Sequence, residues 1–314
     1  MNKHYDILYK EFYKSIYHDE LICLPDQILD YLCIRLCRIS FSNNLDAFKK
    51  QLSNIGCEPN IFNNLLLFES LKQVDCQILS KIINSIYFIQ TPLPYDLGAF
   101  IITSKFLMNG SIFTIFVPTS SMFNWCANIT AIPYSFTKLP YMSPYMIHYG
   151  YGKIYSSAFQ QLDKIIQSSI IDLKITHNID NPHLISTGMS LGGALAGIHA
   201  FRLSQIYPNH KITNISFGSP KFASKEFIQH YKCIKNITTR LYVNNYDIVP
   251  TLPPKTNIIE NLWYHLAELI NGKDDCSISK FKSVNPFCHA HYLGVDFSEY
   301  SFMAQVIRTL SYIK

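Results

Sequence analysis

The apolar positions of the first 88 residues recur at helical spacing. In "LPDQILDYLCIRLCRI" a leucine or isoleucine returns every four residues from Leu24 to Leu36, with Pro25 near the start, and this spacing predicts a helix. The same spacing over residues 64–87 predicts another. The segment "QTPLPYD" then interrupts the pattern with two prolines. We therefore expect a helical N-terminal appendage over residues 1–88, ending at this segment.

Beyond residue 88, short apolar runs alternate with longer amphipathic stretches. The pattern predicts strands over residues 111–117, 183–188, 211–219 and 238–245, and helices over residues 155–170 and 191–207. Alternation of strands with helices is typical of a mostly parallel sheet that is covered on both faces. The fold class expected for residues 89–314 is therefore α/β. No internal repeat or low-complexity segment is evident.

Size and charge narrow the function classes. The 314 residues, 48% of them hydrophobic, can bury a large core, and the length suits one main domain with an appendage. With a net charge of +5 and only 16% charged residues, we expect no nucleic-acid partner. Basic residues outnumber acidic ones between Arg202 and Arg240. This excess indicates either a solvated basic face or weak attraction to an anionic membrane surface.

Three features of the sequence predict the cellular location of the protein. The first twenty residues contain charges throughout and no apolar core of signal-peptide length, and no apolar run has the length of a transmembrane helix. Nine cysteines without paired metal-ligand spacing fit reduced thiols better than a disulfide framework. We expect an intracellular, cytoplasmic protein, with peripheral membrane association as a possibility, and leave its oligomeric state open.

The stretch "TGMSLGGA" contains the strongest chemical signal. Gly188, Ser190 and Gly192 form a G-x-S-x-G pattern between a predicted strand and a predicted helix. This is the arrangement of a nucleophile elbow, in which the serine occupies a sharp turn and the glycines avoid a collision. The helix N-terminus then offers the backbone N–H of Leu191 to an oxyanion. The alternative is a serine in an ordinary glycine-rich turn.

A nucleophilic serine requires a histidine and an acid, which follow it in the chain order Ser, Asp, His in a doubly wound hydrolase. Asp247, in "RLYVNNYDIVPTLPP", comes just after a predicted strand, where open α/β sheets place their sites. It could instead simply open a turn before a proline. The rival acids, which lie in polar or surface-like contexts, are Asp274, Asp275 and Asp296.

Three histidines follow Asp247. His265 lies in an apolar helical pattern, "LWYHLAEL", which is more typical of a core or supporting histidine. His289 and His291, in "NPFCHAHYLGVD", lie in a predicted loop before a short apolar element. Spacing alone does not choose between these two as the base.

Taken in order, four stretches resemble the successive blocks of the class 3 lipase family: "HLISTGMSLGGALAGIHAF", "ISFGSPKFASKEF", "RLYVNNYDIVPTLPP" and "HAHYLG". The segment "IHYGYGKIYSS" is similar to the family block that precedes the elbow helix. The likeness covers roughly residues 95–300 and implies an α/β-hydrolase fold without metal or organic cofactor.

The resemblance also assigns roles to residues. It implies that Ser190 is the nucleophile and Asp247 the acid. It favours His289 over His291 as the base, because the closing block has the form His-x-x-Tyr-x-Gly. In "FVPTSSMFNW" it implies that Thr119 is the second oxyanion donor beside Leu191.

Three positions depart from the family pattern. Val117 stands where the family usually has arginine, Pro118 where it has glycine, and Met189 where it has histidine before the serine. Residues 120–146 correspond to the family's lid, although an ordinary packed loop is the alternative. The expected function is hydrolysis of lipid carboxylic esters, of triacylglycerol or phospholipid type, at a membrane or lipid-droplet surface. The alternative is a catalytically inactive hydrolase fold with a binding or structural role.

Overall fold

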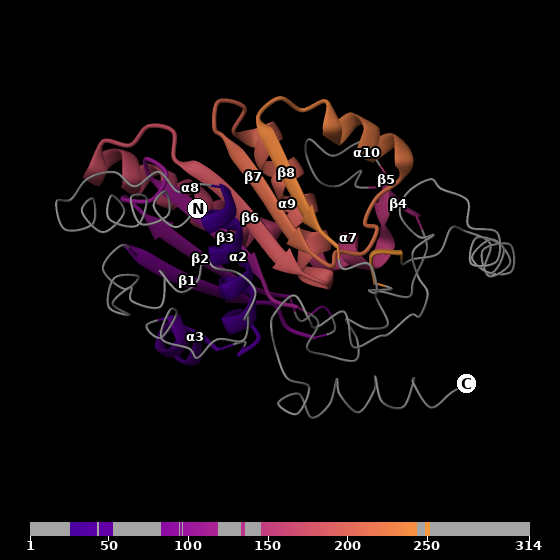
Figure 1. Ribbon diagram of the computed structural model, residues 1–314, viewed down its shortest axis with the longest axis horizontal. Coiled ribbons are helices and arrows are strands. Elements are labelled where there is room, and N and C mark those ends of the chain that lie inside the picture. The colour runs from indigo at the N-terminus through magenta and orange to yellow at the C-terminus, as the bar shows by residue number, and fades with distance from the viewer. Residues whose placement is uncertain are drawn as a thin grey trace, which may run out of the picture.

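A six-stranded sheet forms the centre of the protein. The computed structural model describes residues 26–42, 44–52, 83–93, 95, 97–118, 133–135, 146–243 and 249–251. The strand order is β1-β2-β3-β6-β7-β8, and Figure 1 shows the strands side by side. β1, β2 and β3 pair antiparallel, whereas β3, β6, β7 and β8 pair parallel. The strand bounds are β1 Ser85–Gln90, β2 Gly98–Ser104, β3 Ser111–Phe116, β6 His183–Met189, β7 Ile212–Phe217 and β8 Ile237–Tyr242.

Helices cover both faces of this sheet. One face packs against α2 (Asp26–Ser40) and α3 (Leu45–Leu52), and the other against α7 (Tyr149–Ser156), α8 (Phe159–His177), α9 (Leu191–Ile206) and α10 (Lys225–Lys232). A small antiparallel sheet of β4 (Pro133–Ser135) and β5 (Met146–His148) lies beside α7, and a 3-10 turn spans Val249–Thr251. The expected α/β class is therefore confirmed.

The alternation of side chains along β3 explains the two-layered core. Ile112 and Phe116 enter the cluster that contains α7 to α10, whereas Phe113 and Ile115 enter the cluster that contains α2 and α3. All six residues of β3 are buried. A strand covered on both faces has no solvent side, which is why four of its six residues are large and apolar and only Ser111 and Thr114 are polar.

The N-terminal helix α2 lies directly on the sheet (Figure 1). The predicted helix is confirmed here, and its buried face consists of Leu29, Cys33, Leu36 and Cys37. Of the predicted apolar positions, Leu36 belongs to this face, whereas Leu32 is only partly buried. The Sγ atom of Cys37 lies 3.6 Å from the Oγ1 atom of Thr187 on β6. Within the described part of the chain, α2 is thus a layer of the main core.

Two sequence expectations are corrected. Residues 85–88, expected to end a helical region, form most of β1, because they pair with β2 from Ser85 opposite Thr103 to Gln90 opposite Gly98. The predicted helix over residues 155–170 is two helices, since α7 ends at Ser156 and α8 begins at Phe159. Helical periodicity is a weak signal, and for residues 85–88 antiparallel pairing with the next strand overrides it.

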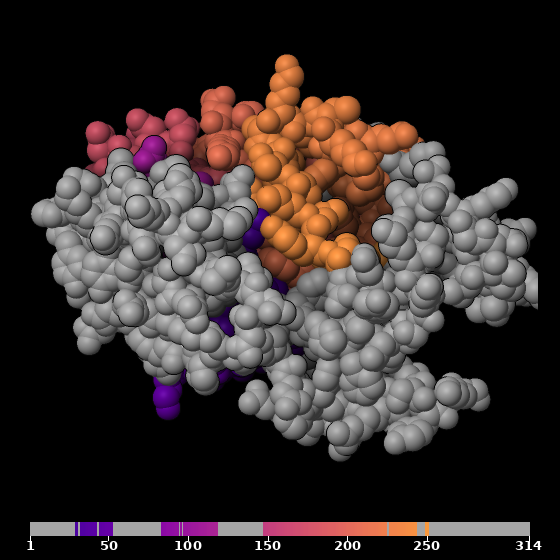
Figure 2. Space-filling view, in the orientation of Figure 1, coloured from indigo at the N-terminus to yellow at the C-terminus, as the bar shows by residue number. Residues whose placement is uncertain are grey.

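None of the helices in the described ranges is long and apolar enough to cross a membrane. Among the described strands, β8 is the last at one side of the sheet, and Figure 2 shows the segment around it at the molecular surface. Most of its side chains are exposed.

Candidate active site

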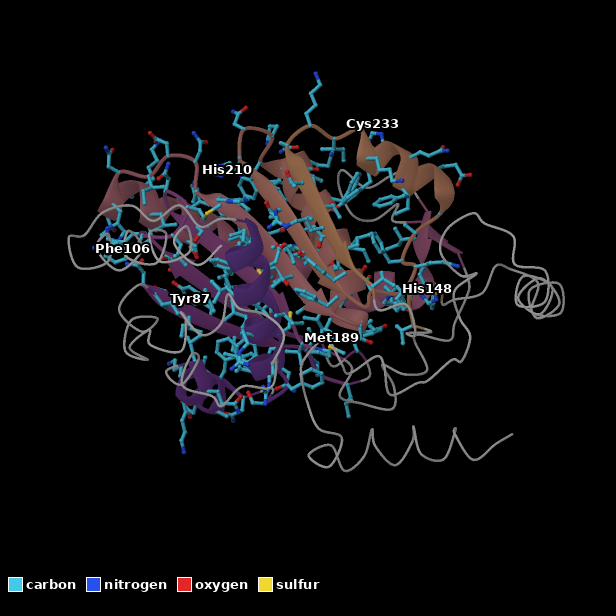
Figure 3. All side chains as sticks on the ribbon, in the orientation of Figure 1. Tyr87, Phe106, His148, Met189, His210 and Cys233 are labelled. Atoms are coloured by element: carbon cyan, nitrogen blue, oxygen red, sulfur yellow. The ribbon has the colours of Figure 1, made fainter. Side chains whose placement is uncertain are left out.

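Ser190 occupies a sharp turn between β6 and α9. Its backbone angles are φ 57° and ψ −127°, a combination that a residue with a side chain rarely adopts and that concentrates at functional sites. Met189, directly before it, lies at the arrowhead of β6 in Figure 3. The serine is therefore held in the strained backbone expected of a nucleophile elbow.

Two glycines allow this turn to close. A Cβ atom on Gly188 would lie 2.2 Å from both the carbonyl carbon and the carbonyl oxygen of Gly192. A Cβ atom on Gly192 would lie 2.5 Å from the carbonyl oxygen of Phe116 on β3. The collision is with backbone in both cases, so no side-chain rotation could relieve it. The predicted need for glycine at these two positions is confirmed.

Backbone hydrogen bonds hold Ser190 in place. Its N–H donates to the carbonyl oxygen of Phe217 on β7 at 2.9 Å, and its own carbonyl oxygen accepts from Gly193 at 2.9 Å and Ala194 at 3.3 Å. The residue is half-buried. Its neighbour Leu191 is the first residue of α9, and in the described part of the chain its N–H has no backbone acceptor. A helix N-terminus with such an N–H suits a developing oxyanion.

The parallel strands end at the same edge of the sheet as Ser190. Phe116, at the end of β3, lies opposite Gly188, and Tyr242, at the end of β8, lies opposite Phe217. The chain continues from β3 through Val117 and Pro118, both buried, toward position 119. It continues from β8 toward position 247. The elbow thus lies between the two strands that lead to the predicted oxyanion donor and the predicted acid.

The other site residues expected from the sequence lie outside the described residues: Thr119, Asp247, Asp274, Asp275, Asp296, His265, His289 and His291. Most of the lid-like segment 120–146 lies outside them as well. Of the predicted site, the structure therefore describes Ser190 and Leu191.

His148, at the end of β5, is a buried histidine that the sequence pattern did not single out. The ring of His148 stacks on that of Tyr151 with centroids 4.2 Å apart. The backbone N–H of His148 donates to the carbonyl oxygen of Phe222 at 2.8 Å. Burial lowers the pKa of His148 to about 4, so it is neutral near pH 7. Both ring nitrogens are buried without hydrogen-bond partners among the described residues. This burial depends on the three-dimensional structure, so the sequence alone could not show it.

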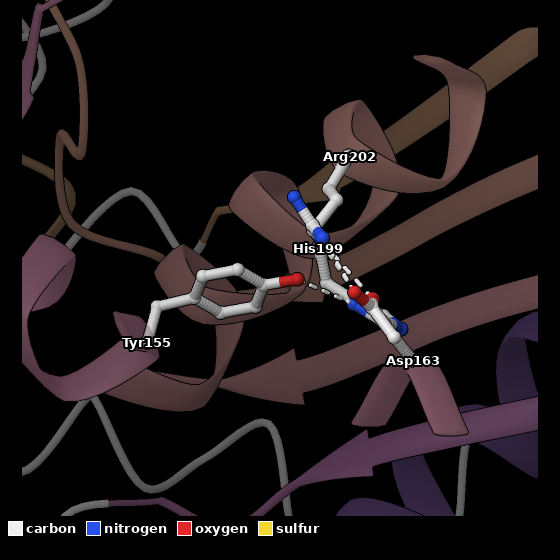
Figure 4. Close-up of polar contacts among 4 residues, drawn as sticks. All are labelled: Tyr155, Asp163, His199 and Arg202. Carbon is white, nitrogen blue, oxygen red and sulfur yellow. Dashed lines mark hydrogen bonds and ion pairs between the residues drawn. The ribbon is translucent and has the colours of Figure 1, made fainter. Parts of the chain in front are cut away.

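A second histidine, His199, belongs to a polar cluster within the core (Figure 4). Its Nδ1 atom lies 2.8 Å from the hydroxyl oxygen of Tyr155. The Nε atom of Arg202 donates to the two carboxylate oxygens of Asp163 at 3.0 and 3.2 Å. Burial, and then the charge of Arg202, lower the pKa of His199 to about 3. These contacts join α7, α8 and α9.

His199 lies nine residues after Ser190 on α9, about 13 Å along the helix axis. It therefore supports the fold and is too far along the helix to reach the serine.

Two arginines of the basic stretch between Arg202 and Arg240 are paired with acidic residues. Arg202 is bound to Asp163, and Arg240 is bound to Asp30 on α2. These two arginines form ion pairs within the protein.

In the ranges that the structure describes, no group of three or more His, Cys, Asp or Glu side chains could hold a metal ion.

A mostly parallel sheet with a strained serine at the strand-to-helix turn is the arrangement of the α/β-hydrolase fold. Residues 113–257 match the family described as "Lipase (class 3)". The lipase of Rhizomucor miehei is 29% identical over 203 residues, which cover 59% of this chain and 53% of that protein. The chain thus spans about half the length of this curated relative. The predicted resemblance to the class 3 lipase family is confirmed.

Solved structures share the fold. The triacylglyceride lipase of Rhizomucor miehei superposes with a TM-score of 0.51 at 21% identity, covering 74% of this chain and 77% of that chain. A triacylglycerol lipase whose catalytic centre is formed by a serine protease triad superposes with a TM-score of 0.55 at 19% identity, covering 87% and 97%. At this identity the likeness concerns the fold, and the expected α/β-hydrolase fold is confirmed.

Proposed function

We propose that this protein is a serine hydrolase that cleaves carboxylic esters of lipids. The observation that carries the proposal is the backbone of Ser190, held at φ 57° and ψ −127° at the start of α9. Such a conformation is costly, and here two glycines and three backbone hydrogen bonds maintain it. An ordinary turn would not require this support. The proposal draws further support from the match of residues 113–257 to class 3 lipases.

The proposed reaction is acyl transfer in two halves. His289 takes the proton of the Ser190 hydroxyl as its oxygen attacks the ester carbonyl carbon, and Asp247 orients the imidazole. The N–H groups of Leu191 and Thr119 stabilise the tetrahedral oxyanion. Its collapse breaks the bond to the alcohol, which leaves with the proton from His289. Water, activated by the same histidine, then releases the carboxylic acid and restores Ser190.

The proposed partner is a lipid surface, either a membrane or a lipid droplet. The turn between β1 and β2 lies at the same edge of the sheet as the carboxyl end of β3, because Ala99 pairs with Phe116. Leu93 in this turn is 65% exposed, and Leu241 and Val243 at the end of β8 are 61% and 52% exposed. Apolar side chains on the rim of the nucleophile edge suit contact with lipid. We propose an intracellular, cytoplasmic protein that associates peripherally with membrane.

Covalent labelling tests the proposal. A fluorophosphonate probe should label the wild-type protein, because the probe requires an activated serine, and should fail to label Ser190→Ala. Turnover of soluble esters, triacylglycerol emulsions and phospholipid vesicles should fall by a factor on the order of 10³ or more in Ser190→Ala and Asp247→Asn, with folding retained.

The outcomes separate the alternatives. Lack of labelling in a folded wild-type protein would favour the inactive hydrolase fold with a binding role. Full activity in Asp247→Asn would move the search for the acid to Asp274, Asp275 and Asp296. The lipid panel distinguishes the substrate classes, because acyl chain and head group are selected by pocket shape.

A further inference from the structure

Asp30 on α2 binds two residues of β8, more than 200 positions later in the chain. The Nε atom of Arg240 donates to Oδ1 of Asp30 at 2.6 Å, and the hydroxyl of Tyr242 donates to Oδ2. Asp30 is 7% exposed. Each carboxylate oxygen therefore has a donor from the same strand, in a setting where charge-assisted hydrogen bonds are strong.

This contact adds an attachment from α2 to the pairing of β8 with β7. The strand pairs with β7, lies at the edge of the described sheet, and leaves most of its side chains exposed. Arg240 and Tyr242 occupy alternate positions and therefore face the same side as α2. Asp30 is thus the polar anchor of β8 on that face.

The anchor lies next to the elbow. The ring of Tyr242 stacks on Phe217 with centroids 5.2 Å apart, and the carbonyl oxygen of Tyr242 accepts from Gly218 at 2.9 Å. Phe217 in turn accepts the hydrogen bond from the N–H of Ser190. The contacts from Asp30 to Ser190 therefore pass through the carboxyl ends of β8 and β7.

Asp247 follows Tyr242 by five residues. We propose that Asp30 is a positioning residue for the catalytic acid: by fixing the carboxyl end of β8 through Arg240 and Tyr242, it fixes the point from which the chain leads to Asp247. This role rests on the proposed hydrolase function. Asp30 acts through β8, since both of its carboxylate oxygens accept hydrogen bonds from that strand.

The test compares two variants that each remove a carboxylate from a partly buried Asp–Arg pair. Asp30→Asn weakens the anchor of β8. Asp163→Asn weakens the pair with Arg202, which lies on the opposite face of the sheet. Both changes are expected to lower the melting temperature, so loss of stability alone does not distinguish them. Kinetics are measured on a soluble ester, well below both melting temperatures.

For Asp30→Asn we expect kcat to fall about tenfold or more, with KM within about twofold, because misplacing a catalytic group affects the transition state more than substrate binding. The acid limb of the pH profile of kcat/KM should move to lower pH, since an imidazole that loses its carboxylate neighbour holds its proton less tightly. Asp163→Asn should keep the wild-type kcat and pH profile.

Tyr242→Phe provides a milder variant that removes one hydrogen bond to Asp30 and retains the ring stacked on Phe217. Its kcat should lie between those of the wild type and Asp30→Asn. If Asp30→Asn and Asp163→Asn have the same kcat and the same acid limb, the positioning role is wrong while the hydrolase function stands. A folded wild-type protein with neither turnover nor fluorophosphonate labelling overturns the proposed function, and the role of Asp30 with it.

Discussion

Substitution of Gly188 by alanine tests whether close backbone packing maintains the elbow. The added methyl group would lie 2.2 Å from the carbonyl carbon and oxygen of Gly192 and 2.8 Å from the nitrogen of Gly193. Non-bonded carbon atoms prefer a separation of about 3.5–4.0 Å. The strand end and the first turn of α9 would therefore have to separate by more than about 1 Å.

The expected cost follows from what the methyl group meets. Overpacking a core typically costs about 1–3 kcal/mol, and the upper end applies here because backbone atoms cannot rotate away. A loss of about 3 kcal/mol lowers the melting temperature by about 6–12 °C in a domain of this size. Moving Ser190 and the N–H of Leu191 by about 1 Å should also lower kcat about 100-fold.

Gly197→Ala, on the helix α9 that follows the elbow, is the matched control. Its methyl group would approach the ring of Phe222 at 2.6 Å, and a ring, unlike backbone, can tilt. Thermal unfolding followed by circular dichroism, together with ester turnover, should show a larger loss for Gly188→Ala in both measurements. Equal melting temperatures and turnover for Gly188→Ala and wild type would refute the inference that backbone contact holds the elbow.

Two further predictions concern histidines. His289→Ala should abolish ester turnover, while His291→Ala should cost less than about tenfold, because one imidazole must lie within about 3 Å of both the Ser190 hydroxyl and the Asp247 carboxylate; an active His289→Ala beside an inactive His291→Ala would exchange the two roles. His199 has a pKa of about 3 in the folded protein against an ordinary 6.5, so the unfolded chain binds more protons between these values and the free energy of unfolding falls as the pH falls below about 6.5. Between about pH 7.5 and about pH 5, urea unfolding should show a loss that is about 2 kcal/mol smaller in His199→Gln than in wild type; equal losses in both proteins would contradict the burial of a neutral His199.

The sequence by itself determined the features that depend on neighbouring residues. The elbow follows from the steric requirements of residues that are close together in the sequence. These are the strand before Ser190, the glycines on either side of it and the small-residue helix after it. The buried strand β3 could also be predicted, because a strand covered on both faces is mostly apolar. Asp247 and His289 stay predictions that rest on chain order and on the family motif.

Tertiary structure decided the features that depend on a partner outside the local apolar pattern. Residues 85–88 continue a helical apolar spacing, yet they form β1 because their backbone groups find partners on β2. Likewise, periodicity predicted the helix α2 but not its place on the sheet, where Cys37 of α2 contacts Thr187 of β6. The contact of Asp30 with Arg240 joins residues that are 210 positions apart. No local pattern encodes such a pair, because its partners meet only after the sheet has assembled and α2 has packed against it.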